Sequence, residues 1–140
     1  MKDDILKVLI SEEQLAAKVQ ALGRQISEDY RDKNLLMVSV LKGSVVFMAD
    51  LMRAVTIPAG IDFMSVSSYG SGTKTSGNVK IIKDLDIALE GYDLLIVEDI
   101  LDSGMTLSFL IDVLWQRNPK SIRICTLLDK PERRAADVQA

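Results

Sequence analysis

Three carboxylates lie close together in the sequence, where an apolar run meets a predicted helix. Glu98, Asp99 and Asp102 fall within five residues. Carboxylate oxygens bind sugar hydroxyls and Mg²⁺, so Glu98 and Asp99 suit either ligand, and Asp102 would then stand near a reacting centre. One alternative stays open: Asp102 or Ser103 only caps the helix and the other acids are solvated, because acids are common at helix N-termini.

The turn after these carboxylates has the composition of a phosphate-binding site. Ser103-Gly104-Met105-Thr106 opens the predicted helix. Backbone N–H groups at a helix N-terminus, together with the hydroxyls of Ser103 and Thr106, can donate hydrogen bonds to a phosphate. Gly104 lets the backbone approach such a ligand closely. A Walker P-loop is excluded, because no G-x-x-x-x-G-K-[ST] pattern occurs in the sequence.

Two further predicted strands end in cationic residues. Lys42-Gly43 follows the first predicted strand, and Lys130, Arg133 and Arg134 follow the last one. A lysine beside a donor-rich turn suits an anion, and so does a group of cations in a mildly acidic protein. Taken alone, the first is better explained as an ordinary turn with a surface lysine and the second as a solvated charge run. Their convergence with the carboxylates is what favours a site.

Residues 69–77 form the least core-like stretch of the chain, Tyr-Gly-Ser-Gly-Thr-Lys-Thr-Ser-Gly. The composition predicts a flexible loop that can close over a bound anion and exclude water, or, as the alternative, a hairpin tip without function. The single cysteine, Cys125, lies in an apolar run and is interpreted as a core residue rather than a nucleophile.

The elements that must position these residues alternate between helix and strand. Ser11 and Gln14 form a capping box before a helix over 12–30, and the spacing of apolar residues predicts further helices after Gly43 and over about 103–117. Apolar or β-branched runs predict strands over 35–41, 61–68, 79–82, 94–97 and 122–128. This order predicts an α/β fold over residues 1–140, one domain with an open, mainly parallel twisted sheet flanked by helices. Such sheets bind ligands at the carboxyl ends of their strands.

Composition excludes several classes of function. The 140 residues contain 17 basic and 20 acidic residues and no histidine, for a net charge of −3. The lack of histidine removes Ser-His-Asp and Cys-His triads, and the charge gives no global attraction for nucleic acid or an anionic membrane. No apolar stretch is long enough to span a bilayer, and the free cysteine fits a reducing compartment, so we expect a cytoplasmic protein.

The residues carry a specific resemblance. Val97 to Leu107, VEDILDSGMTL, is similar to the phosphoribosyl-pyrophosphate-binding motif of the type I phosphoribosyltransferases. The Glu98-Asp99 form, with Leu41-Lys42-Gly43, Ser67-Ser68-Tyr69-Gly70 and Leu128-Asp129-Lys130, resembles the bacterial version of the hypoxanthine-guanine branch. These motifs occur in the family's order over essentially the whole chain.

The resemblance implies transfer of a phosphoribosyl group to N9 of hypoxanthine or guanine. The substrates would be phosphoribosyl pyrophosphate and a 6-oxopurine base, the products pyrophosphate and a purine nucleoside monophosphate (IMP or GMP), and the cofactor Mg²⁺. It also implies a homodimer or homotetramer, with no nucleic-acid or membrane partner. The implied substrate-binding residues are Lys42, Gly43, Ser68, Tyr69, Glu98, Asp99, Ile100, Asp102, Ser103, Gly104, Met105, Thr106, Lys130 and Arg134.

Individual roles follow from the same resemblance. Asp102 would be the catalytic residue, and the segment from Asp102 to Thr106 would bind the 5′-phosphate. Glu98 and Asp99 would hold the ribose hydroxyls and associate with Mg²⁺. The peptide between Leu41 and Lys42, cis in many members, would let Lys42 and Gly43 meet the pyrophosphate.

The remaining roles concern the base and the closing loop. Lys130 would contact the exocyclic oxygen of the purine, and Arg134 the pyrophosphate. Ser68 and Tyr69 would lead the closing loop. Met105 departs from many relatives, which carry lysine at this position, and we expect little effect from the change.

The chain also differs from the family in length. Members continue past the position of Ala140 through a further strand and a Val-Gly-Tyr-Gly-Leu-Asp-Tyr-like segment that forms most of a hood over the base. The resemblance is therefore to a C-terminally shortened member, with phosphoribosyl binding retained and the hood segment absent. Two alternatives stay open: a non-catalytic module that binds phosphoribosyl pyrophosphate or a nucleotide, and an inactive truncated scaffold.

Overall fold

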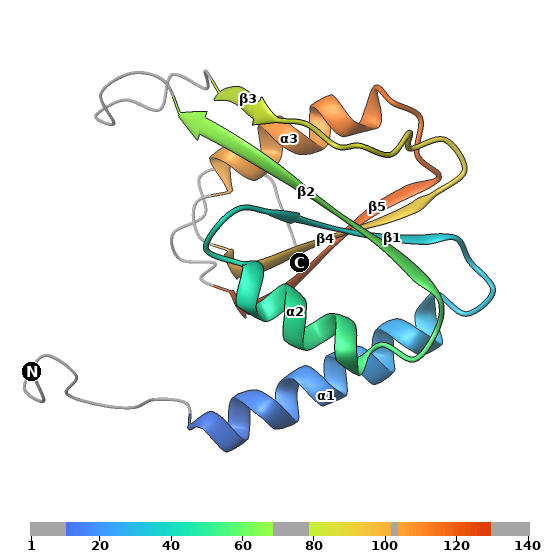
Figure 1. Ribbon diagram of the computed structural model, residues 1–140, viewed down its shortest axis with the longest axis vertical. Helices are drawn as coiled ribbons and strands as arrows, with labels where there is room; N and C mark the ends of the chain where they lie inside the picture. Colours follow the sequence, from blue (N-terminus) through green and yellow to red (C-terminus); the bar gives the residue numbers. More distant parts are fainter. Residues whose placement is uncertain (1–10, 69–78, 102–103, 130–140) are drawn as a thin grey trace, which may run out of the picture.

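The structure is a computed structural model that describes residues 11–68, 79–101 and 104–129 (Figure 1). The expected loop at 69–77 lies outside these ranges. The elements, in chain order, are α1 (Glu12–Asp29), β1 (Leu35–Val40), α2 (Val45–Ala54), β2 (Ala59–Ser68), β3 (Val79–Lys83), β4 (Asp93–Leu101), α3 (Met105–Trp115) and β5 (Ser121–Asp129).

The strands form one sheet in the order β3-β2-β1-β4-β5. β1 pairs in parallel with β2 and with β4, and β4 pairs in parallel with β5. Only β3 is antiparallel, on the outer side of β2. The expectation of an open, mainly parallel sheet is confirmed.

The helices cover both faces of this sheet, α1 and α2 on one face and α3 on the other (Figure 1). Side chains of β1 alternate between two cores: Leu35 and Met37 pack on the α1–α2 side, and Leu36 and Val38 on the α3 side. Because successive strand residues point to opposite faces, a strand covered on both faces is apolar at nearly every position. β1 is therefore the centre of both cores.

Helix α1 begins where the capping box predicts. The Ser11 hydroxyl accepts a hydrogen bond from the Gln14 N–H, and the Ser11 N–H donates to Gln14 Oε1. Farther along, α1 packs closely on α2 at Gly23, where an added Cβ would lie 2.4 Å from Ala54 Cβ and 2.5 Å from the Ala54 carbonyl oxygen. Gly23 is thus required by the close approach of the two helices.

Several element bounds differ from the sequence-based expectation, most of all those of β4 and α3. The fourth strand, expected over 94–97, runs from Asp93 to Leu101, because β5 continues to pair with it as far as Leu101 opposite Asp129. Glu98 and Asp99 consequently lie within a strand and not in the turn after it. Helix α3 ends at Trp115, and the chain then turns through Asn118, which has a φ of 59°.

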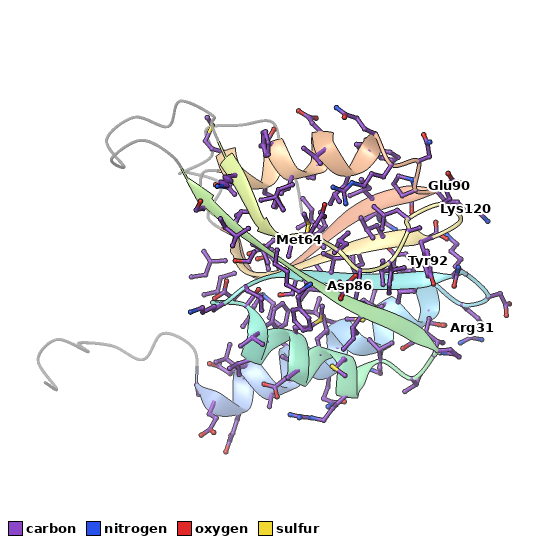
Figure 2. The ribbon with its side chains drawn as sticks, turned by 45° about the horizontal axis from the view of Figure 1, so that its top comes forward. Arg31, Met64, Asp86, Glu90, Tyr92 and Lys120 are labelled. Carbon is purple, nitrogen blue, oxygen red and sulfur yellow. The ribbon has the colours of Figure 1, made fainter. Side chains whose placement is uncertain are left out.

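The amino ends of the parallel strands carry polar and charged groups. Arg31, Glu90, Tyr92 and Lys120 gather there, on the side of the sheet opposite to the carboxyl ends (Figure 2), and the Lys120 N–H donates to the Tyr92 carbonyl. Within the described residues, none of the helices has both the length and the apolar content of a bilayer-spanning segment.

A Gly23→Ala variant tests the close packing of α1 on α2. Alanine favours an isolated helix by about 1 kcal/mol, but here its Cβ meets backbone atoms of Ala54. We expect the variant to lose about 1–3 kcal/mol of unfolding free energy, as overpacked cores do, measured by urea denaturation. Gln20→Ala, at an exposed position of the same helix, is the control and should change stability by less than about 0.5 kcal/mol. A Gly23→Ala variant as stable as the parent would contradict the packing.

Candidate functional site

The parallel strands bring the predicted site residues to one edge of the sheet. β1 ends at Val40, β2 at Ser68, β4 at Leu101 and β5 at Asp129. We call the edge that these four strand ends form the carboxyl edge. Lys42, Gly43, Glu98, Asp99, Ile100, Gly104, Met105 and Thr106 are all within the described residues at or next to this edge.

The turn after β1 lies beside β4. The peptide bond between Leu41 and Lys42 is cis, as the resemblance implies. The Leu41 N–H donates to the Met64 carbonyl of β2 at 2.7 Å, and the Val45 N–H closes the turn on the Lys42 carbonyl at 3.1 Å. Lys42 and Gly43 are both exposed. A Cβ added at Gly43 would stand 3.7 Å from Asp99 Oδ2, so the turn is in contact distance of that carboxylate.

Glu98 and Asp99 occupy opposite faces of β4. By strand alternation Glu98 shares a face with Ile96, in the α3-side core, and Asp99 shares a face with Val97, in the α1–α2 core. Asp99 is held by the Ile100 N–H, which donates to its Oδ1 at 2.8 Å. The two carboxylates thus flank the end of β4, Asp99 on the side of the Gly43 turn.

Burial sets the electrostatics of Glu98. Desolvation, and then the negative charge of Asp99, raise the pKa of Glu98 to about 7. Glu98 is partly buried, and a carboxylate with such a pKa binds a proton, a cation or a hydroxyl donor more readily than a fully exposed one does. This environment fits a carboxylate that receives a sugar hydroxyl or a metal ion.

The carboxylates of Glu98 and Asp99 fit Mg²⁺ as part of its coordination. The carboxylates of β4 are oxygen ligands of the kind that Mg²⁺ takes. Over residues 11–68, 79–101 and 104–129, however, no three acidic or cysteine side chains group closely enough to form a metal site. An ion at the carboxyl edge would therefore take further oxygens from the substrate or from water, as Mg²⁺ bound with phosphates does.

The start of α3 supplies a backbone suited to a phosphate. Gly104 is the N-cap residue, with a φ of 80° that favours glycine, and as a glycine it offers no capping side chain of its own. Its carbonyl accepts the Ser108 N–H at 2.8 Å. Thr106, in the first turn, is exposed, and Ile100 at the end of β4 is 40% exposed.

The other predicted residues lie outside what the structure describes. These are the side chain of Ser68, the last residue of β2, and the whole of Tyr69, Asp102, Ser103, Lys130 and Arg134. The chain connects Asp102 and Ser103 directly to Leu101 and Gly104, and Lys130 directly to Asp129. The predicted roles of these residues stay predictions.

Comparison with known proteins identifies the family. The profile of the phosphoribosyl transferase domain matches residues 9–139. The chain belongs to the phosphoribosyl transferase family. It is 54% identical over 140 residues to the hypoxanthine-guanine phosphoribosyltransferase of Bacillus subtilis, covering all of this chain and 78% of that protein.

Other members of the family agree with this assignment. The hypoxanthine-guanine phosphoribosyltransferase of Mycobacterium avium is 51% identical over 141 residues, covering 96% of this chain and 70% of that protein. The crystal structure of a hypoxanthine phosphoribosyltransferase from Staphylococcus aureus superposes with a TM-score of 0.92 at 47% identity, covering 96% of this chain and 73% of the other. The expected family and fold are confirmed.

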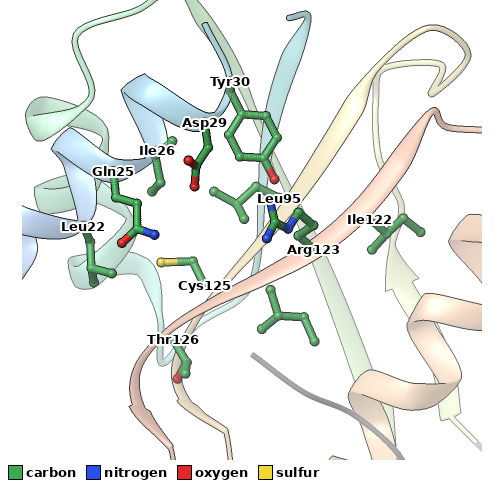
Figure 3. Close-up of a pocket in the computed structure, with 11 residues that line it drawn as sticks. Leu22, Gln25, Ile26, Asp29, Tyr30, Leu95, Ile122, Arg123, Cys125 and Thr126 are labelled. Carbon is green, nitrogen blue, oxygen red and sulfur yellow. The ribbon is translucent and has the colours of Figure 1, made fainter.

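This phosphoribosyl transferase also has a cavity of about 500 Å³ on the α1 side of the sheet (Figure 3). It lies between α1 and β5, with Leu22 and Asp29 on one side and Arg123 and Cys125 on the other. Burial raises the pKa of the Cys125 thiol to about 11, which disfavours the thiolate, so its interpretation as a core residue holds. Sequence reasoning did not predict this cavity, because the alternating residues of β5 do not reveal what lies against them.

Two buried serines beside the Gly43 turn received no role in the sequence analysis. Ser39 is 0% exposed and Ser44 is 1% exposed, and their hydroxyls share a hydrogen bond. In the sequence, this buried pair is indicated only by the presence of hydroxyl residues in an otherwise apolar region.

A Glu98→Gln variant tests the electrostatics of β4. Because the folded-state pKa of Glu98 is about 7, above its ordinary 4.5, the folded state holds the proton more tightly. Stability of the parent should therefore fall as the pH rises from 4.5 through 7, and glutamine removes that loss. We expect the variant to be more stable than the parent at pH 8 by at most about 3.5 kcal/mol, since each pKa unit corresponds to about 1.4 kcal/mol. Near pH 4 the two should be equally stable.

Urea denaturation between pH 4 and pH 8 measures this difference. Glu90→Gln, at an exposed position, is the control and should follow the pH dependence of the parent. If Glu98→Gln also followed the parent at every pH, the pKa of Glu98 would not be raised in the folded state.

Proposed function

We propose that this chain transfers the phosphoribosyl group of phosphoribosyl pyrophosphate to N9 of hypoxanthine or guanine, giving IMP or GMP and pyrophosphate in purine salvage. The observation that carries the proposal is the 54% identity over all 140 residues to a hypoxanthine-guanine phosphoribosyltransferase. The carboxyl edge supports it, because it brings together two carboxylates, an exposed lysine and a helix start with glycine at the N-cap, and these groups suit an activated sugar phosphate.

The activated sugar lies across the carboxyl edge. The segment from Asp102 to Thr106 binds the 5′-phosphate with backbone N–H groups and hydroxyls. Glu98 and Asp99 accept hydrogen bonds from the ribose hydroxyls and would associate with Mg²⁺. When bound, Mg²⁺ offsets the charge of the pyrophosphate. Lys42 and Gly43 bind the pyrophosphate, and Ile100 and Met105 complete the binding segment.

The base enters from the β5 side. Lys130 donates to the 6-oxo group of the purine, which selects hypoxanthine or guanine over adenine, and Arg134 contacts the pyrophosphate. Ser68 and Tyr69 lead the loop 69–77 over the bound sugar. Closure excludes water, whose attack on the sugar is the competing reaction.

The transfer exchanges one bond for another at ribose C1. The bond from C1 to the pyrophosphate oxygen breaks, and its electron pair leaves with pyrophosphate. Purine N9 bonds to C1, and the N9 proton passes to Asp102, whose negative charge also offsets the positive charge that develops on the ribose.

The same proposal includes assembly and location. Val45, Val46 and Met52 of α2 and Trp115 of α3 are between 41% and 69% exposed, which supports burial of these apolar side chains in a homodimer or homotetramer. The free thiol of Cys125 fits a reducing compartment, and we place the protein in the cytoplasm.

Release of pyrophosphate from phosphoribosyl pyrophosphate and Mg²⁺ tests the reaction. Release should require hypoxanthine or guanine, should not occur with adenine, and should fall about 100-fold or more in Asp102→Asn, since a positioned general base contributes about 10²–10⁴-fold. Asp112→Asn, in the middle of α3, is the control and should keep the activity. A folded chain that binds the sugar but releases no pyrophosphate with any base would leave a binding module in place of the enzyme.

A further inference from the structure

The junction between β1 and α2 contains a buried pair of hydroxyls directly below the exposed Lys42-Gly43 turn. Ser39, in β1, and Ser44, at the start of α2, are 0% and 1% exposed. Their Oγ atoms share a hydrogen bond, and the Ser44 Oγ donates to the Val40 carbonyl at 2.8 Å. A serine hydroxyl can donate only one hydrogen bond. Because the Ser44 hydroxyl donates to the Val40 carbonyl, it accepts the hydrogen bond that the Ser39 hydroxyl donates. We call this arrangement the serine clasp.

The clasp uses Ser44 in an unusual way. Ser44 is the N-cap residue of α2, and an N-cap serine ordinarily accepts a hydrogen bond from the first turn of its helix. Here the Ser44 side chain makes no capping bond and points back to β1 instead. The hydroxyl therefore ties the start of α2 to the end of β1, and the three residues between them are held in a closed turn.

The strand to which the turn is tied is itself fixed on both sides. Ser39 lies opposite Phe63 of β2 and Val97 of β4. The pairing of β1 with β4 ends at Ser39 and Val97, two residues before Asp99, whose Oδ2 lies 3.7 Å from the Cβ position of Gly43. A shift of the Lys42-Gly43 turn would consequently change its distance from the β4 carboxylate.

We propose that Ser39 and Ser44 are positioning residues, which hold the Lys42-Gly43 turn in the geometry that binds the pyrophosphate group of the sugar substrate. The inference rests on the proposed function for the identity of the anion. Buried hydroxyls cost free energy unless they are bonded, so the pair favours the one turn geometry that satisfies both. Neither hydroxyl needs to touch the substrate, because the clasp acts through the position of Lys42 and Gly43.

The test compares Ser44→Ala with a matched loss of a buried hydroxyl elsewhere. Ser27, 6% exposed, donates to the Gly23 carbonyl at 2.8 Å and accepts the Thr56 N–H at 2.9 Å, joining α1 to the end of α2. Ser27→Ala therefore also removes two hydrogen bonds from a buried serine, but away from the carboxyl edge. Urea denaturation measures the unfolding free energy of both variants, so that their losses of stability can be compared.

Binding of pyrophosphate with Mg²⁺, of phosphoribosyl pyrophosphate with Mg²⁺ and of IMP is measured by calorimetry in each variant. We expect Ser44→Ala to weaken both pyrophosphate-containing ligands about tenfold, the equivalent of about 1.4 kcal/mol, while IMP, which lacks pyrophosphate, stays within about twofold of the parent. Ser27→Ala should leave all three affinities within about twofold. In turnover, Ser44→Ala should raise KM for the sugar substrate and leave KM for the base unchanged.

A second variant keeps the test decisive if Ser44→Ala fails to fold. Ser39→Ala removes one hydroxyl but leaves the Ser44 bond to Val40, so we expect a smaller loss of pyrophosphate affinity in the same direction. The double variant should lose no more affinity than Ser44→Ala alone, because Ser44→Ala already removes the bond between the two hydroxyls that Ser39→Ala removes.

These measurements distinguish a failure of the proposed function from a failure of the serine clasp. If the parent binds the pyrophosphate ligands but turns over no base, the proposed function fails, and the comparison of Ser44→Ala with Ser27→Ala still decides the clasp. Equal pyrophosphate affinities in the parent, Ser39→Ala and Ser44→Ala would overturn the clasp. A parent that binds no pyrophosphate would overturn both.

Discussion

Parallel pairing of β1 with β2 on one side and β4 on the other is the constraint on which the rest of the structure depends. Parallel strands all end at the same edge, so residues that are far apart in the sequence meet without any loop having to reach for them. Gly43 and Asp99 illustrate this, since their residue numbers differ by 56 and yet a Cβ at Gly43 would contact the Asp99 carboxylate. The apolar side chains of β1, packed into both cores, hold that pairing in place.

The carboxyl edge combines a stable scaffold with unfavourable electrostatics. Glu98 is partly buried and lies on the opposite face of β4 from Asp99, and its raised pKa shows that this placement disfavours its charged form. A core position in a strand would favour an apolar residue on stability grounds alone. Functional sites commonly retain such local costs, and here the groups that offset the charge come from the ligand in the proposed function.

The sequence predicted most of the fold, because its signals were local. Alternating apolar faces, the Ser11–Gln14 capping box and the doubly buried run at 35–40 all reflect interactions within a few residues. The length of β4 was underestimated, since charged residues at its end suggested a turn. Pairing with β5 extends the strand there, and that pairing depends on a partner more than 20 residues away.

The candidate site was predicted as a set of residues but not as an arrangement. Residue types indicated which groups bind sugars and phosphates, and the family resemblance supplied roles. Strand alternation, which sends Glu98 and Asp99 to opposite faces, required the exact extent of β4. The serine clasp was not predictable, because a hydroxyl in an apolar run does not reveal which carbonyl or hydroxyl it will bond.

The most direct test of the account maps where phosphoribosyl pyrophosphate and Mg²⁺ bind, by the change in backbone amide chemical shifts of the folded chain. We expect the large shifts at 42–44, 98–101 and 104–107, along the carboxyl edge. We also expect that Leu22, Tyr30 and Arg123, around the cavity between α1 and β5, change little. Shifts centred on that cavity, with the carboxyl edge unchanged, would contradict the central claim that the parallel strand ends form the site.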